Sequence, residues 1–102
     1  MRLISKRRLR EFWKLHSSSR EVLEEWYRIV NNKGLAWEDF HDLQATFASA
    51  SHVGKCVVFN IGGNNYRLIT QINYLTYNVF VKAVLTHSEY SRGKWQKKCG
   101  CI

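Results

Sequence analysis

A short segment near the C-terminal end of the chain concentrates side chains that can move protons or bind phosphate. The run His87–Trp95 contains an imidazole, a phenol, a guanidinium and an ammonium group, at His87, Tyr90, Arg92 and Lys94. Histidine titrates near neutral pH and can give or take a proton. Tyrosine can donate a proton or stack on a base, and arginine binds phosphate oxygens as a planar fork. Together these residue types favour chemistry on a phosphodiester.

Cleavage of RNA without a metal ion requires three functions that such side chains can share. One group removes the 2′-hydroxyl proton, another protonates the leaving 5′-oxygen, and a cation stabilises the phosphorane. Arg67 and Lys55 add two cations from earlier in the chain. The residue types alone leave structural alternatives open: His87 as a hydrogen-bonding residue, Arg67 as a solvated or ion-paired side chain, and Tyr90 as a cover over the core's edge.

The cysteines and acidic residues predict neither a disulfide framework nor a metal site. Cys56 lies in an apolar stretch, where we expect a buried thiol, and Cys99 and Cys101 lie in a short tail. An odd number of cysteines gives no disulfide framework. The Cys-Gly-Cys tail lacks the second ligand pair of a zinc site, and no set of acidic residues and histidines has ligand spacing. We therefore expect metal-independent chemistry and no cofactor.

Length and charge limit the possible classes of protein. The chain has 102 residues, 45% of them hydrophobic, which predicts one folded domain over residues 1–102. Sixteen lysines and arginines against eight acidic residues give a net charge of +8, which favours a nucleic acid or an acidic protein as partner. No apolar run approaches the roughly 20 residues of a membrane span, and no signal-peptide core is present, so we expect a cytoplasmic location and no membrane partner.

The N-terminal half predicts helices. After a short strand at residues 2–4, Ser5 is expected to cap a first amphipathic helix. Ser18 and Glu21 have capping-box spacing for a second helix, which ends near residues 31–34. A third, shorter helix is expected over residues 37–47, ended by a polar stretch at residues 49–52.

The C-terminal half predicts a three-strand meander, and the chain as a whole predicts the α+β class. Strands are expected at Val53–Ile61, Tyr66–Tyr74 and Asn78–Leu85, with a tight turn at residues 62–65. Helices then cover one face of an antiparallel sheet and leave the other partly open. The alternation of side chains puts Arg67 on the face opposite the core. If the second turn pairs Tyr74 with Asn78, Arg67 lies opposite Leu85, His87 leaves the sheet on the side of Arg67, and Lys55 lies on the first strand of the meander.

Two stretches of the sequence resemble the HigB branch of the RelE/ParE toxin superfamily. They are VFNIGGNNYRLI at Val58–Ile69 and LTHSEY at Leu85–Tyr90. Members of this branch typically combine such a strand–turn–strand with such an ending. The resemblance follows the order of elements along nearly the whole chain and is most specific from Val57 to Tyr90. The N-terminal half agrees as a helical, basic segment.

The resemblance implies a RelE-like fold, with N-terminal helices packed on a curved antiparallel sheet and a short C-terminal segment. It implies a toxin that cleaves mRNA, commonly on the translating ribosome, and a cognate antitoxin that we expect to be a HigA-like helix-turn-helix protein. The family's strand arginine falls on Arg67, and its terminal histidine and tyrosine fall on His87 and Tyr90, with the acid and base roles of the last two left open. The predicted site comprises catalytic Arg67, His87 and Tyr90 and RNA-binding Lys55, Arg92 and Lys94.

Two other functions are compatible with the same features. A non-catalytic RNA-binding module also accounts for the charge and the exposed aromatic side chains. A protein-directed inhibitor, such as the gyrase poisons of the ParE branch, would use the basic surface against an acidic protein, although the Leu85–Tyr90 ending argues against that branch. Loss of RNA cleavage in His87→Ala with retained RNA binding would separate catalysis from binding.

Overall fold

A five-stranded sheet with helices on both sides forms the centre of the molecule, as described by a computed structural model of residues 1–102. The strands are β1 (Arg2–Ile4), β2 (Ser51–Val53), β3 (Cys56–Ile61), β4 (Tyr66–Asn73) and β5 (Asn78–Thr86), in the spatial order β1-β5-β4-β3-β2. Strands β3 to β5 pair antiparallel, as expected, while β2 adds to β3 antiparallel and β1 adds to β5 in parallel. The α+β class is confirmed, with a mixed rather than a purely antiparallel sheet.

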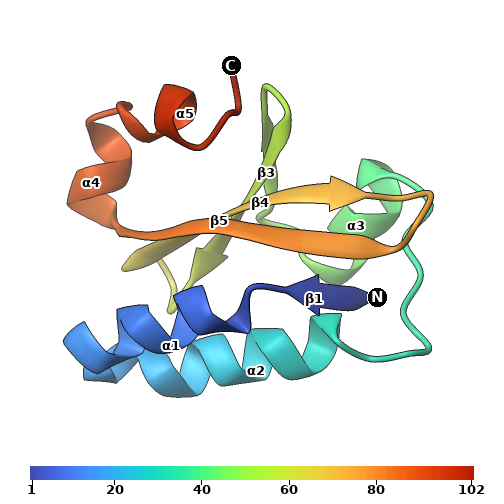
Figure 1. The fold of residues 1–102 in the computed structure, drawn as a ribbon, viewed down its shortest axis with the longest axis horizontal. Helices are drawn as coiled ribbons and strands as arrows, with labels where there is room; N and C mark the ends of the chain where they lie inside the picture. The colour runs from blue at the N-terminus through green and yellow to red at the C-terminus, as the bar shows by residue number, and fades with distance from the viewer.

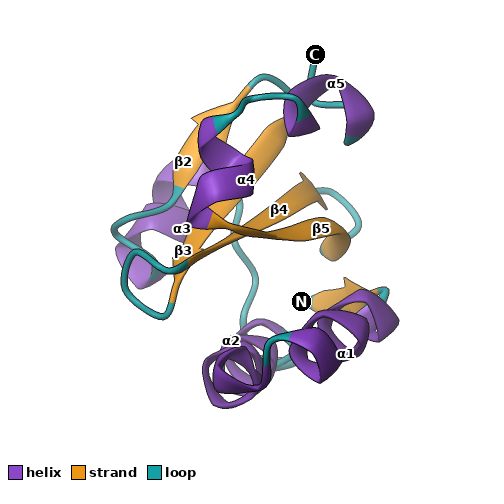
Figure 2. Ribbon diagram, turned by 90° about the vertical axis from the view of Figure 1, so that its left-hand side faces the viewer, coloured by secondary structure: helices purple, strands orange, loops and turns teal.

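The helices form two groups on opposite sides of this sheet. One group contains α1 (Lys6–Leu15), the 3₁₀ turn η1 (Ser17–Ser19) and α2 (Arg20–Val30). Helix α3 (Phe40–Thr46) comes next along the chain. Figure 1 shows α1 and α2 side by side beneath the sheet, and α4 (His87–Ser91) and α5 (Trp95–Lys98) beyond its other face. Figure 2 shows the same separation from the side. None of these helices combines the length and apolar composition that crossing a bilayer requires.

The main core lies between the sheet and the pair α1–α2. Apolar residues three and four positions apart point inward from α2, because one face of a helix repeats at that spacing. Trp26 packs edge-on against Phe59 of β3, with 5.3 Å between ring centroids. Each large apolar side chain buried here stabilises the fold by roughly 1.5–3 kcal/mol. The buried set includes Leu9, Leu23, Trp26, Val30, Phe59 and Leu68.

The predicted capping box at Ser18 and Glu21 is wrong. Helix α2 begins at Arg20 directly from the 3₁₀ turn, and Ser19 already has helical dihedral angles, so no extended residue precedes the helix. The Ser18 hydroxyl instead lies 2.7 Å from the Tyr66 hydroxyl. A capping box is present elsewhere, at the start of α4, where Thr86 and Glu89 bind each other's backbone.

The predicted strand Val53–Ile61 is two strands, β2 and β3, joined by a tight turn at Gly54 and Lys55. Gly54 has a φ of +56°, and a Cβ there would lie 2.1 Å from the Cys101 carbonyl oxygen, so only glycine fits. Lys55 therefore lies in this turn and is exposed, rather than on the first strand of the meander. The polar residues expected to end α3 include Ser51 and His52, which belong to β2.

The pairing of β4 with β5 places Arg67 opposite Leu85, as expected, by a different route. The turn pairs Asn73, not Tyr74, with Asn78. A β-bulge then adds one residue to β5, because Ile69 pairs with Ala83 while Thr70 pairs with Val81, leaving Lys82 unpaired. The one-residue error in the turn is thus compensated before the strand reaches Arg67.

The sheet face expected to be partly open is largely covered by the C-terminal segment. A second apolar cluster on this face contains Cys56, Val58, Ile69, Trp95 and Cys101, with Tyr90 and Leu85 packed at its margin. Cys56 is buried, but it is not a free thiol, because it forms a disulfide with Cys101. The Lys55 amide donates to the Cys101 carbonyl at 2.8 Å, which brings the tail alongside the start of β3. Cys99 is the one free cysteine.

Candidate active site

The candidate site lies where the β3–β4 turn meets the junction of β5 and α4. Arg67 is the second residue of β4, and α4 begins at His87 immediately after β5 ends. The His87 backbone N–H donates to the Asn65 carbonyl at 3.0 Å, which joins the start of α4 to the turn before β4. The structure thus brings the arginine of one strand and the start of the next helix to the same end of the sheet.

Arg67 is a buried cation without a carboxylate partner. Its side chain is 7% exposed, and it takes part in neither of the two ion pairs of the structure. Nη1 donates to the carbonyls of Asn64 and Tyr66 at 3.2 Å each, and Nη2 donates to Asn64 Oδ1 at 2.9 Å. A guanidinium has five N–H donors, so two remain for an anion. Burial of a charge paired only with neutral groups costs free energy, which points to a functional role.

Tyr90 lies over the guanidinium of Arg67, with 5.1 Å between Arg67 Cζ and the ring centroid. Its ring also stacks on Trp95 at 5.1 Å between centroids, with 18° between the ring planes. The Trp95 indole N–H donates to the Tyr90 carbonyl at 2.9 Å. Tyr90 therefore both covers Arg67 and packs on the C-terminal segment, so the structure brings Arg67 and Tyr90 together.

His87 is the exposed first residue of α4, three positions before Tyr90 in the same helical turn. Residues with this spacing share a helix face. The turn is fixed by the capping box: the Thr86 N–H donates to Glu89 Oε1 at 3.0 Å, and the Glu89 N–H donates to Thr86 Oγ1 at 3.2 Å. Chiefly the hydrogen bond from the Thr86 backbone holds the pKa of Glu89 below its ordinary value. Glu89 is thus an ionised cap of the helix that carries His87 and Tyr90.

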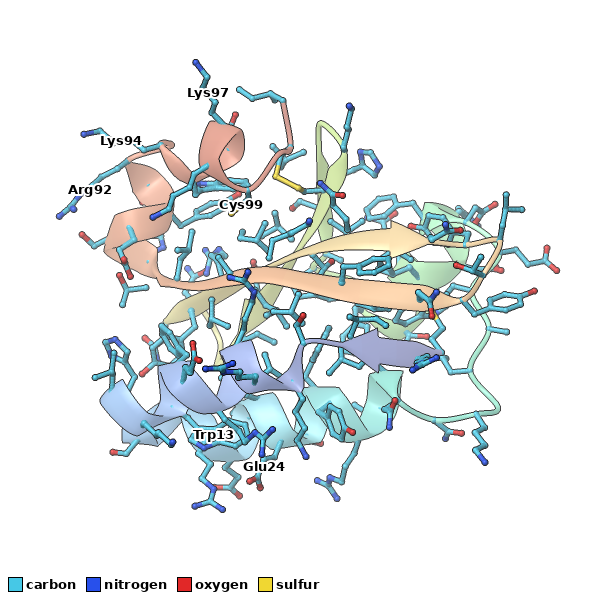
Figure 3. All side chains as sticks on the ribbon, in the orientation of Figure 1. Trp13, Glu24, Arg92, Lys94, Lys97 and Cys99 are labelled. Atoms are coloured by element: carbon cyan, nitrogen blue, oxygen red, sulfur yellow. A yellow bond between two sulfur atoms is a disulfide. The ribbon has the colours of Figure 1, made fainter.

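The three predicted RNA-binding cations lie in two places. Arg92 and Lys94 are exposed beside Tyr90, and Figure 3 shows both side chains extending away from the sheet. They line a small cavity of about 180 Å³ together with Leu85, Glu89, Trp95 and Lys98. Lys55 lies elsewhere: Arg67 pairs with Asn60, five residues further along β3, which is roughly 16 Å at the rise of a strand. The structure does not bring Lys55 to Arg67.

Two residues near this site were not among the predicted site residues, although Asn64 matches a position of the family pattern with an expected structural role. Asn64 holds the guanidinium of Arg67 with both its backbone and its side-chain oxygen. His16, at the end of α1, stacks on Phe12 and lies 6.2 Å from the Tyr66 ring. The position of Asn64 in a predicted turn three residues before Arg67 could have indicated its role. Nothing in the sequence relates His16 to β4, because 50 residues separate it from Tyr66.

One group of potential metal ligands lies outside this site, at the start of α3. Ligand atoms of Asp39, His41 and Asp42 lie within 4.8 Å of one another, a grouping that the spacing analysis did not find. All three side chains are exposed. Asp39 Oδ1 accepts the Asp42 N–H at 2.9 Å, and Asp42 Oδ2 accepts the Glu38 N–H at 3.1 Å. The two carboxylates therefore already cap the start of α3.

Comparison with known proteins agrees with this architecture. The chain is 27% identical over 93 residues to the mRNA interferase HigB of Escherichia coli O6:H1 (strain CFT073), an alignment that covers 90% of each chain. The sequence profile of the HigB toxin family, described as the RelE-like toxic component of a toxin–antitoxin system, matches residues 19–93. The matched range includes Arg67, His87, Tyr90 and Arg92. Membership of such a family implies a cognate antitoxin as partner. The chain belongs to the HigB toxin family of RelE-like toxins.

Proposed function

We propose that this toxin is an endoribonuclease that cleaves mRNA on the ribosome, in the cytoplasm, by acid–base chemistry without a metal ion. The single observation that carries the proposal is the buried guanidinium of Arg67, which lacks a carboxylate partner and lies beneath Tyr90. Such a cation can bind an anionic phosphate with its two remaining N–H groups. The likeness to an mRNA interferase supports RNA as the source of that phosphate.

The proposed reaction is a transfer of the phosphoryl group within the RNA. The 2′-oxygen attacks the adjacent phosphorus as it loses its proton, and the bond from phosphorus to the 5′-oxygen breaks as that oxygen gains a proton. The products are a 2′,3′-cyclic phosphate and a 5′-hydroxyl end. Arg67 stabilises the extra negative charge on the phosphorane. His87 and Tyr90 share the two proton transfers, while Arg92 and Lys94 bind neighbouring phosphates.

The phenol of Tyr90 can give a proton to a leaving oxygen or, as a phenolate, accept one. Its ring lies over the guanidinium of Arg67, with 5.1 Å from Cζ to the ring centroid, which places Tyr90 beside the proposed phosphate site. His87 supplies an imidazole, a group that can also give or take a proton. These two residues therefore form the proposed acid–base pair, and their individual roles follow from the pH profiles of single variants.

The cognate antitoxin is proposed to be a HigA-like helix-turn-helix protein. Lys55 is proposed to contact RNA at a position away from the phosphate being cleaved. The decisive test is induced expression followed by mapping of new RNA 5′ ends, with Arg67→Ala as the comparison. Cuts within translated mRNA that disappear in the variant support the proposal. Growth arrest without new RNA ends would favour a protein target such as gyrase, and RNA binding without cuts would favour a non-catalytic module.

A further inference from the structure

The C-terminal flap, which we define as residues 93–102, is fastened to the sheet mainly at its far end. Cys101 is bonded covalently to Cys56 at the start of β3, and its carbonyl accepts the Lys55 N–H at 2.8 Å. Gln71 of β4 donates to the Gly100 carbonyl at 3.1 Å. Near the start of the flap, Trp95 is buried on the sheet face with 5% exposure. Figure 3 shows the disulfide as a yellow bond between the flap and the sheet.

Helix α4 has separate attachments. The capping box between Thr86 and Glu89 fixes its first turn, and the His87 N–H is bound to Asn65. These bonds lie at the opposite end of α4 from the flap. Movement of the flap therefore leaves the backbone of His87 and Tyr90 in place while it removes Trp95 from the Tyr90 ring.

The flap explains why Arg67 is inaccessible. A phosphate must contact the guanidinium directly, yet the side chain of Arg67 is 7% exposed, with the Tyr90 ring over it. The Tyr90 ring is in turn stacked on Trp95, with 5.1 Å between ring centroids. With Trp95 displaced, the Tyr90 side chain can turn away from the guanidinium and expose it. The state with the flap bound is thus closed to substrate.

We propose that Cys56 and Cys101 form a reversible thiol–disulfide modification site, whose oxidation locks the flap over Arg67 and inhibits RNA cleavage. This inference rests on the proposed role of Arg67 in that reaction. The reagent that modifies this site is a low-molecular-weight thiol or disulfide of the glutathione class. The site couples the oxidation state of two sulfur atoms to access to the catalytic guanidinium.

The external thiol and the external disulfide are the only reactants that this exchange needs in order to balance atoms and electrons. A thiolate of the external thiol attacks one sulfur of the Cys56–Cys101 bond, which breaks, and a mixed disulfide forms while the other cysteine leaves as a thiolate and takes up a proton. A second external thiol attacks the mixed disulfide, so that two free cysteines and one external disulfide result. Oxidation runs the same steps in reverse, with the external disulfide accepting two electrons.

Cys99 supplies a matched control. It packs against the same apolar cluster as the disulfide, but its sulfur forms no disulfide bond. Burial raises the pKa of its thiol, although Arg8, Lys98 and Lys82 act in the opposite direction. Since the thiolate is the reactive form, Cys99 competes poorly in exchange at neutral pH. A serine at this position is therefore expected to leave the response to oxidation intact.

The test compares the full chain in its oxidised and reduced forms, prepared with oxidised glutathione or dithiothreitol, which is then removed under anaerobic conditions. Each form is added to ribosomes translating a defined mRNA, and the rate of cleavage is measured. We expect the reduced form to cleave at least tenfold faster, Cys101→Ser to cleave at the fast rate under both treatments, and Cys99→Ser to respond like the parent. Equal rates for the two forms of the parent, or a faster oxidised form, would overturn the proposal.

Hydrogen–deuterium exchange gives a second measurement that does not depend on activity. Reduction is expected to increase exchange in residues 93–102 while exchange in β4 and β5 stays unchanged. General loss of protection would mean that the disulfide only stabilises the whole fold, which contradicts a specific role in holding the flap over Arg67. If the flap opens on reduction but neither form cleaves RNA, control of the flap by the disulfide is supported and the proposed nuclease function fails. The chemically reduced parent keeps the test decisive if Cys101→Ser does not fold.

Discussion

Trp95 contacts Tyr90 twice, through a hydrogen bond of 2.9 Å from its indole N–H to the Tyr90 carbonyl and through a stacked ring at 5.1 Å. The position of the Tyr90 phenol over Arg67 therefore depends on a residue that follows it in the chain. Substitutions of Tyr90 must preserve this stacking if they are to report on the hydroxyl group alone.

Tyr90→Phe keeps the ring and its packing but removes the hydroxyl, so we expect a fold of unchanged stability and cleavage slowed by 10- to 100-fold, within the range of a lost proton transfer. His87→Gln is expected to slow cleavage by a similar factor and to change the pH profile of the rate, because an amide cannot exchange a proton as an imidazole does. Single-turnover rates across pH measure both effects. A Tyr90→Phe protein that folds normally and cleaves at the parental rate would reduce Tyr90 to a packing role.

Arg67→Lys is expected to lose most of the cleavage activity although the charge is retained, because an ammonium cannot reproduce the planar fork. Loss of one transition-state contact of this kind costs on the order of 3 kcal/mol, or about a hundredfold in rate. Arg7→Lys is a suitable control, since Arg7 is exposed and pairs only with Glu11. Parental cleavage by Arg67→Ala would remove this residue from the mechanism.

Asn64→Ala removes the side-chain acceptor that fixes Nη2 of Arg67 at 2.9 Å. We expect kcat to fall by about tenfold with little change in KM, because the guanidinium keeps its charge but loses its orientation. Asn65→Ala provides the matched control, since Asn65 contributes only its backbone carbonyl to the site. Equal rates in the two variants would show that the Asn64 side chain has no positioning role.

Glu89 makes the stability of the α4 turn depend on pH in a defined direction. Its folded-state pKa is lowered, so its contribution is fully present above the unfolded value of about 4.3 and is lost as pH falls through the folded value. Glu89→Gln is therefore expected to be less stable than the parent at pH 7, with a difference that shrinks toward pH 3. Thermal unfolding across this range measures the trend. A constant difference would mean that ionisation of Glu89 is irrelevant to the cap.

Cleavage is expected to persist in excess chelator, because the residues around Arg67 offer no set of metal ligands. The Asp39, His41 and Asp42 group lies on another element and serves as the control site. Asp39→Asn should leave the rate of cleavage unchanged. Activity that is abolished by chelator and restored by one divalent ion would contradict this expectation, provided that intact ribosomes are verified in the same sample.

Local sequence patterns predicted the strands around the site well. The predicted pairing of Tyr74 with Asn78 was one residue in error, and it placed Arg67 opposite Leu85 only because the bulge at Lys82 offsets that error. Features that depend on distant packing were not predictable. The bulge at Lys82 has no local sequence signal, and the Cys56–Cys101 bond joins residues 45 positions apart. The false capping box at Ser18 shows the same limit, since the Tyr66 hydroxyl engages that serine from the sheet.

The parallel pairing of β1 with β5 has a consequence for how the chain acquires its structure during synthesis. Leu3 pairs with Val79, so the first strand has no partner until most of the polypeptide has been made. Helices α1 and α2 can form early, but their apolar faces pack on strands that come later. Contacts between residues so far apart in sequence make folding slow relative to helical bundles of the same size. The nascent chain therefore cannot complete its sheet until β5 has been synthesised.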